Sequence, residues 1–406
     1  MSLLSRRGAI TVFLVFAIAY FLSALVRAIT ATLAPTLTRE FDLSAQQLGL
    51  LAGGYFLGFA AMQLPLGTWL DRHGPRKVIL GFLFVAVAGC LAFSMANSFS
   101  GLLAARVLCG VGVSACLMAP LTAYRRWLSA HAQLRANSWM LMTGSFGMVA
   151  STLPVQWLMP LVGWRPLFWA LAAAIALSML VIAWKVPMWE TAQGQEKEDA
   201  PTRGYREVWG HPYFRRTAPM AFFIYGGMVA VQTLWAGPWL VRVSGYAALQ
   251  AATGLFFINL SMLGTFWTWG LLSPWLTRRG LDADTLMTWG LPLSFLVLIA
   301  IIIAGPAAGA GAWALYCMTC TFVALSQPAV GMAFTSDLAG RALSAFNLAI
   351  FAGVFAIQWG VGLMVDGFMA LGLDEVSSFR GAMAVLLVCC VISYGHFVLA
   401  KDNSHQ

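Results

Sequence analysis

The stretch GAITVFLVFAIAYFLSALVRAITATLAPTLT, residues 8–38, decides the fold. It is apolar for long enough to cross a bilayer as one helix, and Arg27 carries its only formal charge. At about 1.5 Å per residue, Arg27 lies roughly 18 Å from Arg39 and roughly 30 Å from Arg7, which places it near the middle of the membrane. Because a charge is costly at that depth, we expect Arg27 to face the protein interior or a water-filled cavity.

The polar residues of this stretch share one face of the expected helix. Tyr20, Ser23, Arg27 and Thr30 follow the i, i+3, i+7, i+10 spacing. The first span therefore predicts a polar stripe that contains a cation, and we take Tyr20, Ser23 and Arg27 as candidate substrate-binding residues.

The composition of the whole chain indicates a polytopic, all-α membrane protein. Of its 406 residues, 60% are hydrophobic and only 10% are charged, with a mean hydropathy of +0.79. Arg6 and Arg7 before the first apolar run could begin a signal peptide, but the run is too long and lacks a small-residue cleavage site. We therefore expect an uncleaved first span, and a net charge of +9 that reflects membrane topology rather than nucleic-acid binding.

Hydropathy predicts twelve spans in two bundles of six. The spans are centred near Tyr20, Gly58, Val87, Val111, Gly147, Ala174, Val229, Gly264, Leu296, Thr321, Gly353 and Leu387. We predict an N-terminal bundle over residues 1–187, a solvated cytoplasmic linker over 188–216, and a C-terminal bundle with a short tail over 217–406. Most Lys and Arg residues fall on the side of both termini, which indicates a cytoplasmic (inner) membrane protein with both ends in the cytoplasm.

The two halves are related by a repeat with a constant shift. Tyr20 corresponds to Tyr225, Arg27 to Gln232 and Gly49 to Gly254, in each case 205 positions later. Transporters are often built from such repeats, with the substrate site between the halves. Span seven would then add Tyr225, Gln232 and Trp235 to the candidate substrate-binding residues.

The sequence predicts neither an enzyme nor a cofactor. No pairing of a nucleophile with a base and no metal-binding cluster is visible. Cys317 and Cys320 form a CxxC pattern, but no second thiolate pair accompanies it, so we expect packing residues there. We expect a monomer in the bilayer that binds a small-molecule substrate and no nucleic acid. The candidate coupling partners are H⁺, Na⁺ and a counter-anion.

The segment GTWLDRHGPRK, residues 67–77, joins spans two and three. It resembles the signature loop of the major facilitator superfamily, through Gly67, Asp71, Arg72, Gly74, Arg76 and Lys77. This resemblance implies a two-bundle transporter fold in which the loop stabilises one conformation. Locally, we expect Gly67 to allow close helix contact, Asp71 to favour a helix N-terminus, and the arginines to reach cytoplasmic carbonyls or acids.

The segment LVRAITATLAPTL, residues 25–37, is similar to the first helix of organic-anion members of that superfamily, including the organophosphate:phosphate antiporters. By this resemblance Arg27 is a substrate-binding residue. Those antiporters have a second arginine in span seven, where this chain has Gln232. One arginine suits a monoanion such as a carboxylate, and the amide adds a neutral hydrogen bond.

Coupling candidates are few because no acid lies deep in a span. The segment from Arg106 to Gly112 has an arginine followed by glycines at 110 and 112. It resembles a second motif of the superfamily, whose arginine is linked to coupling. Asp366, near the outer end of span eleven, and His396, near the inner end of span twelve, are the other candidates. Three further polar residues could bind substrate or join helices by hydrogen bonds: Asn259, Asn347 and Gln358.

Three functions stay open from the sequence. The first is a secondary transporter of a small organic monoanion that works by alternating access. The second is efflux of neutral or lipophilic compounds, although span five lacks the glycine- and proline-rich element typical of drug/proton antiporters. The third is a transporter-like membrane sensor, although no signalling domain is visible.

Overall fold

The computed structural model describes residues 4–188 and 201–400, and these residues form helices throughout. The long apolar runs have no water to satisfy backbone groups in a bilayer, so each satisfies its own hydrogen bonds as a helix. In the first half the helices are α1 (Arg6–Phe41), α2 (Ala45–Ala61), α3 (Gln63–Met95), α4 (Phe99–Val113), α5 (Ala115–Trp127), α6 (Ala130–Ala150), α7 (Leu153–Val162) and α8 (Trp164–Lys185).

The second half is more interrupted. Its elements are α9 (Pro201–Gly210), α10 (Pro212–Met220), η1 (Ala221–Tyr225), α11 (Gly226–Ala230), η2 (Val231–Trp235), α12 (Ala236–Pro238), η3 (Trp239–Val243), α13 (Ala248–Arg278), α14 (Ala283–Ala304), η4 (Gly305–Ala307), α15 (Ala310–Cys320), η5 (Thr321–Leu325), α16 (Ser326–Met332), α17 (Ser336–Ala370) and α18 (Glu375–Leu399). The segments η1, η2 and η3 are π-helical, and η4 and η5 are 3₁₀-helical.

Ten helical stretches of the described residues are long and apolar enough to cross a membrane, and a bent pair around Ser151 would make eleven. The predicted span near Gly58 is the one that falls short, because α2 has only 17 residues. Gly74, with φ 76° and ψ 161°, interrupts α3. The break therefore falls inside the signature segment 67–77, with residues 63–73 before it and residues 75–95 forming the next span.

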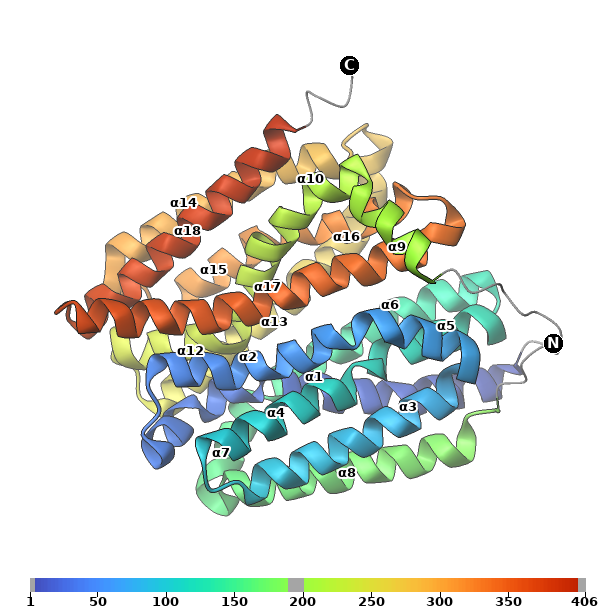
Figure 1. Ribbon diagram of the computed structural model, residues 1–406, viewed down its shortest axis with the longest axis horizontal. Coiled ribbons are helices and arrows are strands. Elements are labelled where there is room, and N and C mark those ends of the chain that lie inside the picture. The colour runs from blue at the N-terminus through green and yellow to red at the C-terminus, as the bar shows by residue number, and fades with distance from the viewer. Residues whose placement is uncertain (1–3, 189–200, 401–406) are drawn as a thin grey trace. The chain divides into compact units, whose positions relative to one another are not determined.

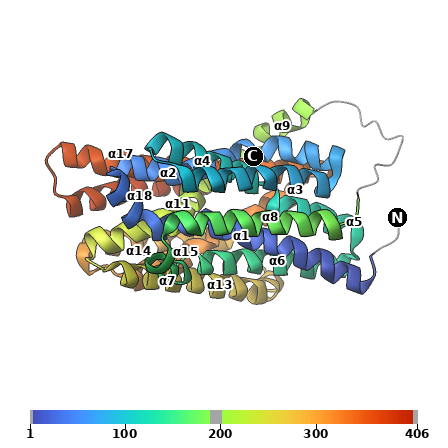
Figure 2. The same ribbon diagram turned by 90° about the horizontal axis from the view of Figure 1, so that it is seen from below.

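Contacts between residues group the chain into two compact units. Unit 1 combines α1 up to Ile29 with the chain from Gly54 through α8, and unit 2 combines Thr30–Gly53 with the chain from α9 through α18. Within unit 1, α3 packs against α4 and α8, as Figure 1 shows. Within unit 2, α17 packs beside α18 and α14 packs beside α15. The long helices of each unit run side by side, which is clearest in Figure 2.

The predicted cytoplasmic linker is partly folded. Residues 189–200 lie outside the described residues, but α9 follows them and is amphipathic. Val208 of α9 and Phe214 of α10 are fully buried in an apolar cluster with Val330 and Phe346 of unit 2. The expectation of a wholly solvated linker is therefore wrong for this part, because α9 has an apolar face that packs on the bundle.

Candidate functional site

Arg27 lies inside unit 1, as its depth in the first span predicted. Its guanidinium carbon is 5.5 Å from the ring centroid of Phe59 on α2, and the side chain is only half-buried. It also interacts electrostatically with the hydroxyl groups of Tyr20 and Tyr55. The charge therefore faces aromatic and hydroxyl groups of its own bundle and does not point at lipid headgroups.

The polar stripe of α1 packs against α6. Tyr20 and Ser23 are both buried. A Cβ atom added to Gly144 would lie 2.5 Å from the Tyr20 ring, and one added to Gly147 would lie 2.3 Å from the carbonyl oxygen of Phe21. The two glycines thus allow α6 to approach closely and fix the position of the Tyr20 ring next to the arginine.

Arg106 of α4 belongs to the same cluster. It is fully buried, and its Nη1 donates a hydrogen bond to the carbonyl oxygen of Val26, 3.0 Å away. Its guanidinium carbon lies 5.1 Å from the ring centroid of Tyr55, and that ring stacks on Phe59 at 6.1 Å. A pair of stacked rings therefore separates the two cations, and Arg106 holds the α1 backbone beside Arg27.

Two long stretches of the first half of the chain contain basic residues but no acidic ones. The sequence has no Asp or Glu in residues 1–39 or 72–189. Arg27 and Arg106 lie in these two stretches at membrane depth, and their charges create a positive potential in a low-dielectric region. Such a region favours an anion.

The predicted amide residues of unit 2 form hydrogen-bonded pairs. Gln232 Nε2 donates to Asn259 Oδ1 at 3.1 Å, and Gln358 Nε2 donates to Thr233 Oγ1 at 3.0 Å. Trp235 Nε1 donates to the backbone carbonyl of Gln358 at 3.2 Å. The Oε1 atom of Gln358 is buried without a hydrogen-bond partner. These residues form one buried polar cluster, in which α17 is tied to span seven.

Two other candidates of unit 2 lie apart from this cluster. Asn347 Oδ1 accepts a hydrogen bond of 2.8 Å from Gln327 Nε2, which joins α17 to α16. Tyr225 packs against the apolar cluster that contains Phe214 and Phe346. Asn347 therefore takes part in a helix–helix contact, which is the alternative role that the sequence left open for it.

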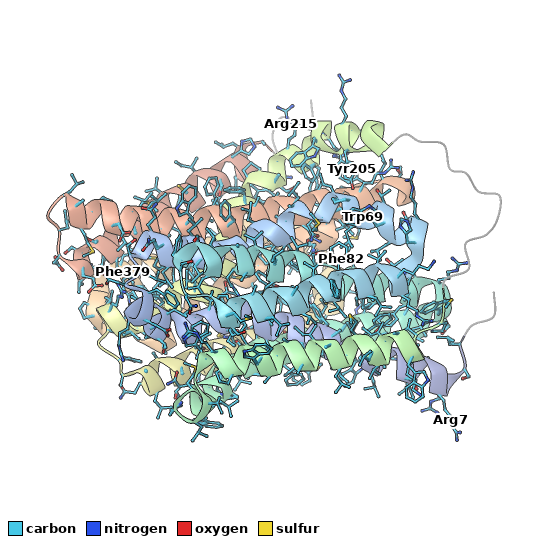
Figure 3. All side chains as sticks on the ribbon, turned by 60° about the horizontal axis from the view of Figure 1, so that its bottom comes forward. Arg7, Trp69, Phe82, Tyr205, Arg215 and Phe379 are labelled. Carbon is cyan, nitrogen blue, oxygen red and sulfur yellow. The ribbon has the colours of Figure 1, made fainter. Side chains whose placement is uncertain are left out.

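Span seven carries a feature that the sequence did not predict. It alternates between α-helical and π-helical turns, and η2 contains Gln232, Thr233 and Trp235. π-helical turns inside α-helices are frequent at functional sites. Trp235 and Trp239 pack edge-on against Phe379 of α18, which Figure 3 labels. Glycine and proline at 226, 227, 237 and 238 were the available signal of irregularity.

The signature loop makes part of the contacts expected of it. Arg76 donates a hydrogen bond to the carbonyl oxygen of Ala183 at the end of α8, as predicted for its arginines. The rings of Trp69 and Phe82, on either side of the Gly74 turn, lie 5.7 Å apart (Figure 3). The close contact expected at Gly67 is absent from the described structure, since an added Cβ would meet no atom within 4 Å.

The remaining coupling candidates lie at the ends of unit 2. Both carboxylate oxygens of Asp366 accept hydrogen bonds from backbone N–H groups, those of Ala45 at 3.1 Å and Gln46 at 2.8 Å. His396 is near the other end, where its Nε2 lies 3.3 Å from the carbonyl oxygen of Arg215. Asp366 is therefore fixed in a helix–helix contact.

An ion pair at the end of unit 2 that carries His396 was not predicted from the sequence. Arg216 Nη1 and Asp284 Oδ2 are 2.7 Å apart, with side chains only 8% and 15% exposed. Arg216 Nε donates to the carbonyl oxygen of Phe397, and the Tyr213 hydroxyl donates to Asp284 Oδ1, each at 2.7 Å. The pair ties α10 to α14 and α18. Its partners are 68 residues apart, and no local pattern links them.

No metal site is evident in the part of the chain that the structure describes, and one pocket lies apart from the predicted site residues. Within residues 4–188 and 201–400, no group of three or more His, Cys, Asp or Glu side chains is placed to hold a metal. A pocket of about 540 Å³ lies between α13 and the start of α15, lined by residues such as Tyr246, Gln250, Thr253 and Phe257. Its lining includes none of the candidate site residues.

These features define a polytopic, all-helical membrane protein with a cationic cluster inside one helical unit. The sequence model of the Major Facilitator Superfamily matches residues 16–363. The chain therefore belongs to the Major Facilitator Superfamily.

Comparison with individual proteins agrees with this membership. The chain is 29% identical over 147 residues to the hexuronate transporter of Escherichia coli K12, covering 36% of this chain and 34% of that protein. It is 24% identical over 255 residues to a probable sulfoacetate transporter of Cupriavidus necator, covering 59% and 58%. The match thus spans about a third of the first relative and somewhat more than half of the second.

Solved structures show the same fold over nearly the full length. A bacterial homologue of the human lysosomal transporter Spinster, in an inward-facing and unoccupied conformation, superimposes with a TM-score of 0.79 and 18% identity over 98% of both chains. A D-xylose–proton symporter superimposes with a TM-score of 0.75 and 14% identity, over 97% of this chain and 98% of the other. At these identities the likeness concerns the fold alone.

Proposed function

We propose that this protein is a secondary transporter of a small organic monoanion, most simply a carboxylate, and that Arg27 binds the anion. The observation that carries the proposal is the half-buried guanidinium of Arg27, which lies near Phe59, Tyr20 and Tyr55, while the only acid in α1 and α2 is Glu40 near the end of α1. A planar guanidinium can hold a carboxylate through two parallel hydrogen bonds, which gives both charge and orientation.

The names of the relatives support an organic-anion substrate. They include transporters of hexuronate and of 4-hydroxybenzoate, each of which carries one carboxylate, and a probable transporter of sulfoacetate, which carries a sulfonate as well as a carboxylate. These compounds differ in size and shape but share an acidic group. A single fixed cation with hydroxyl and aromatic neighbours fits that shared group, and the rest of the site would set the selectivity.

The transport cycle that we propose is alternating access, in which the two halves rock about the bound substrate. The halves are those predicted by the repeat, residues 1–187 and 217–406, joined by residues 188–216. The protein acts as a monomer in the cytoplasmic membrane with both termini inside, coupled to H⁺, Na⁺ or a counter-anion. In this scheme the substrate also makes uncharged contacts with Gln232, Asn259, Gln358 and Trp235. The loop from Gly67 to Lys77 stabilises one conformation.

The coupling residues of this cycle are proposed from the sequence candidates. Arg106, Asp366 and His396 stay the candidates. Arg106 acts on Arg27 through its hydrogen bond to the Val26 carbonyl and is therefore a positioning residue in the proposed site.

Uptake into proteoliposomes tests the proposal. We expect labelled D-glucuronate or 4-hydroxybenzoate to enter vesicles that contain the wild type, and Arg27→Ala to reduce uptake by about tenfold or more, since a hydrogen bond to a charged group contributes about 1.5–3 kcal/mol. Arg27→Lys should retain part of the activity because it keeps the charge and loses the planar fork.

Arg165→Ala is the matched control, because Arg165 is an arginine of unit 1 that lies at the start of α8 over the Trp164 ring. This variant should transport normally. Unchanged carboxylate uptake in Arg27→Ala would instead favour the alternative of neutral or lipophilic substrates.

A further inference from the structure

The first part of α2 and the last part of α17 meet backbone to backbone within unit 2. A Cβ atom added to Gly49 would lie 2.2 Å from the carbonyl oxygen of Gln358, and one added to Gly362 would lie 2.3 Å from the carbonyl oxygen of Ala45. One added to Gly53 would touch Phe355 at 3.0 Å. We call this contact the α2–α17 seam (Ala45, Gly49, Gly53, Phe355, Gln358 and Gly362). Its residues are spaced so that glycine or alanine recurs every fourth position on α2, which allows the close approach.

Asp366 closes the end of this seam. It follows Gly362 by one turn, and its two carboxylate oxygens accept the hydrogen bonds of Ala45 and Gln46, the first two N–H groups of α2. The neighbouring residues of α2 form their own capping box, in which Ser44 N–H donates to Gln47 Oε1 at 3.1 Å and Gln47 N–H donates to Ser44 Oγ at 3.3 Å. The acid from α17 thus accepts the hydrogen bonds of two N–H groups that this capping box does not satisfy, and its negative charge interacts favourably with the positive end of the α2 dipole.

The seam lies where two continuous helices leave one unit for the other. The boundary between the units falls after Ile29 in α1 and after Gly53 in α2, although both helices continue through it. The residues of α2 before the boundary are counted with unit 2 and contact α17. If the first six spans move as one body, as alternating access requires, this contact must break when the transporter opens on the Asp366 side.

We propose that Asp366 is a gate residue: its double hydrogen bond to the N-terminus of α2 holds the α2–α17 seam closed, and its release lets the seam open as a unit. The proposal rests on the alternating access of the proposed function but not on the identity of the substrate. Asp366 does not touch the solute in this role, so its charge acts on the rate of opening and not on substrate recognition.

Amide hydrogen exchange of the intact protein, without substrate, tests the gate. We expect Asp366→Ala to accelerate exchange roughly tenfold or more in peptides over residues 45–53 and also over residues 355–366, because loss of a charge-assisted cap lowers the free energy of opening for both sides of the seam. Asp366→Asn, which retains one acceptor oxygen, should give a smaller acceleration and serves if the alanine variant does not fold.

Two controls come from the chain itself. Asp374 is another acid near this end of α17, but it caps its own helix, accepting from Ser377 N–H. Asp374→Ala should leave the seam peptides unchanged. On α17, Gly362→Ala should open the seam because its Cβ meets Ala45, whereas Gly360→Ala should not, since nothing lies within 4 Å of that position.

Faster exchange confined to the amides of Ala45 and Gln46, or no change, would show that Asp366 is only a local cap and would overturn the gate. Equal acceleration in α8 would also overturn it, because the acid would then stabilise the whole fold. None of these outcomes depends on uptake or on Arg27, so a failed gate leaves the proposed function untouched, and lost substrate selectivity leaves the gate untouched.

Discussion

Three buried or half-buried arginines show how differently the same side chain can be used. Arg216 is neutralised by Asp284, Arg106 is bonded to the Val26 carbonyl, and Arg27 faces rings and hydroxyl groups. The depth of Arg27 could be predicted from the sequence because an apolar run fixes depth by residue count. The Arg216–Asp284 pair could not, because only tertiary packing brings its partners together.

The Arg216–Asp284 pair leads to a prediction for stability. Asp284→Ala removes the acid and leaves the buried guanidinium of Arg216 uncompensated, so we expect a loss of about 3–5 kcal/mol in the free energy of unfolding. Glu375→Ala, which breaks the more exposed pair with Arg242, should cost no more than about 1 kcal/mol. Thermal unfolding in detergent gives both values.

The double variant Asp284→Ala with Arg216→Met separates the cause from a general packing defect. Removing both charges should recover much of the lost stability, because the main penalty is the unpaired cation. A double variant less stable than Asp284→Ala alone would contradict this explanation.

At the scale of elements, hydrophobic runs predicted where helices lie but not how they are wound. The length of each apolar run determines a span, so the centres of the predicted spans all fall in helices. The π-helical turns of span seven change the hydrogen-bond partners of the backbone, and they depend on packing against neighbouring helices. The end of α2 at Ala61 has a local cause, because Pro65 has no N–H for the Ala61 carbonyl and its ring clashes with that group in a continuous helix.

The glycines of α4 give a prediction for helix packing. A Cβ added to Gly110 would lie 1.9 Å from the carbonyl oxygen of Tyr55, whose ring lies against Arg106. We expect Gly110→Ala to force α2 and α4 apart, to lower stability by about 1–3 kcal/mol and to reduce anion uptake. Gly81→Ala, where nothing lies within 4 Å, should change neither quantity.

Thermal unfolding and uptake of the two variants, measured side by side, check this prediction. If Gly110→Ala behaved like Gly81→Ala, the α2–α4 contact would not be needed to position the rings between Arg106 and Arg27.

At the scale of the whole molecule, family and architecture followed from the sequence, whereas much of the site did not. The signature loop and the apolar spans indicated the superfamily, and the family comparison and the all-helical structure confirm it. The sequence identified amide residues of the polar cluster in unit 2, but it did not predict which of them form hydrogen bonds with each other. Amides within spans can join helices or meet a ligand, and composition alone does not separate these roles.

The central claim is that the charge of Arg27 binds an organic anion. Ligand-dependent thermal stabilisation tests it most directly, because a ligand at a hundred times its Kd stabilises the folded state by about 2.7 kcal/mol. D-glucuronate and 4-hydroxybenzoate would each be compared with its neutral amide, in the wild type, Arg27→Gln and the control Arg165→Gln. We predict that at least one acid stabilises the wild type and Arg165→Gln, that its amide does not, and that Arg27→Gln does not respond. Equal stabilisation of Arg27→Gln, or equal stabilisation by the amide, would contradict the account.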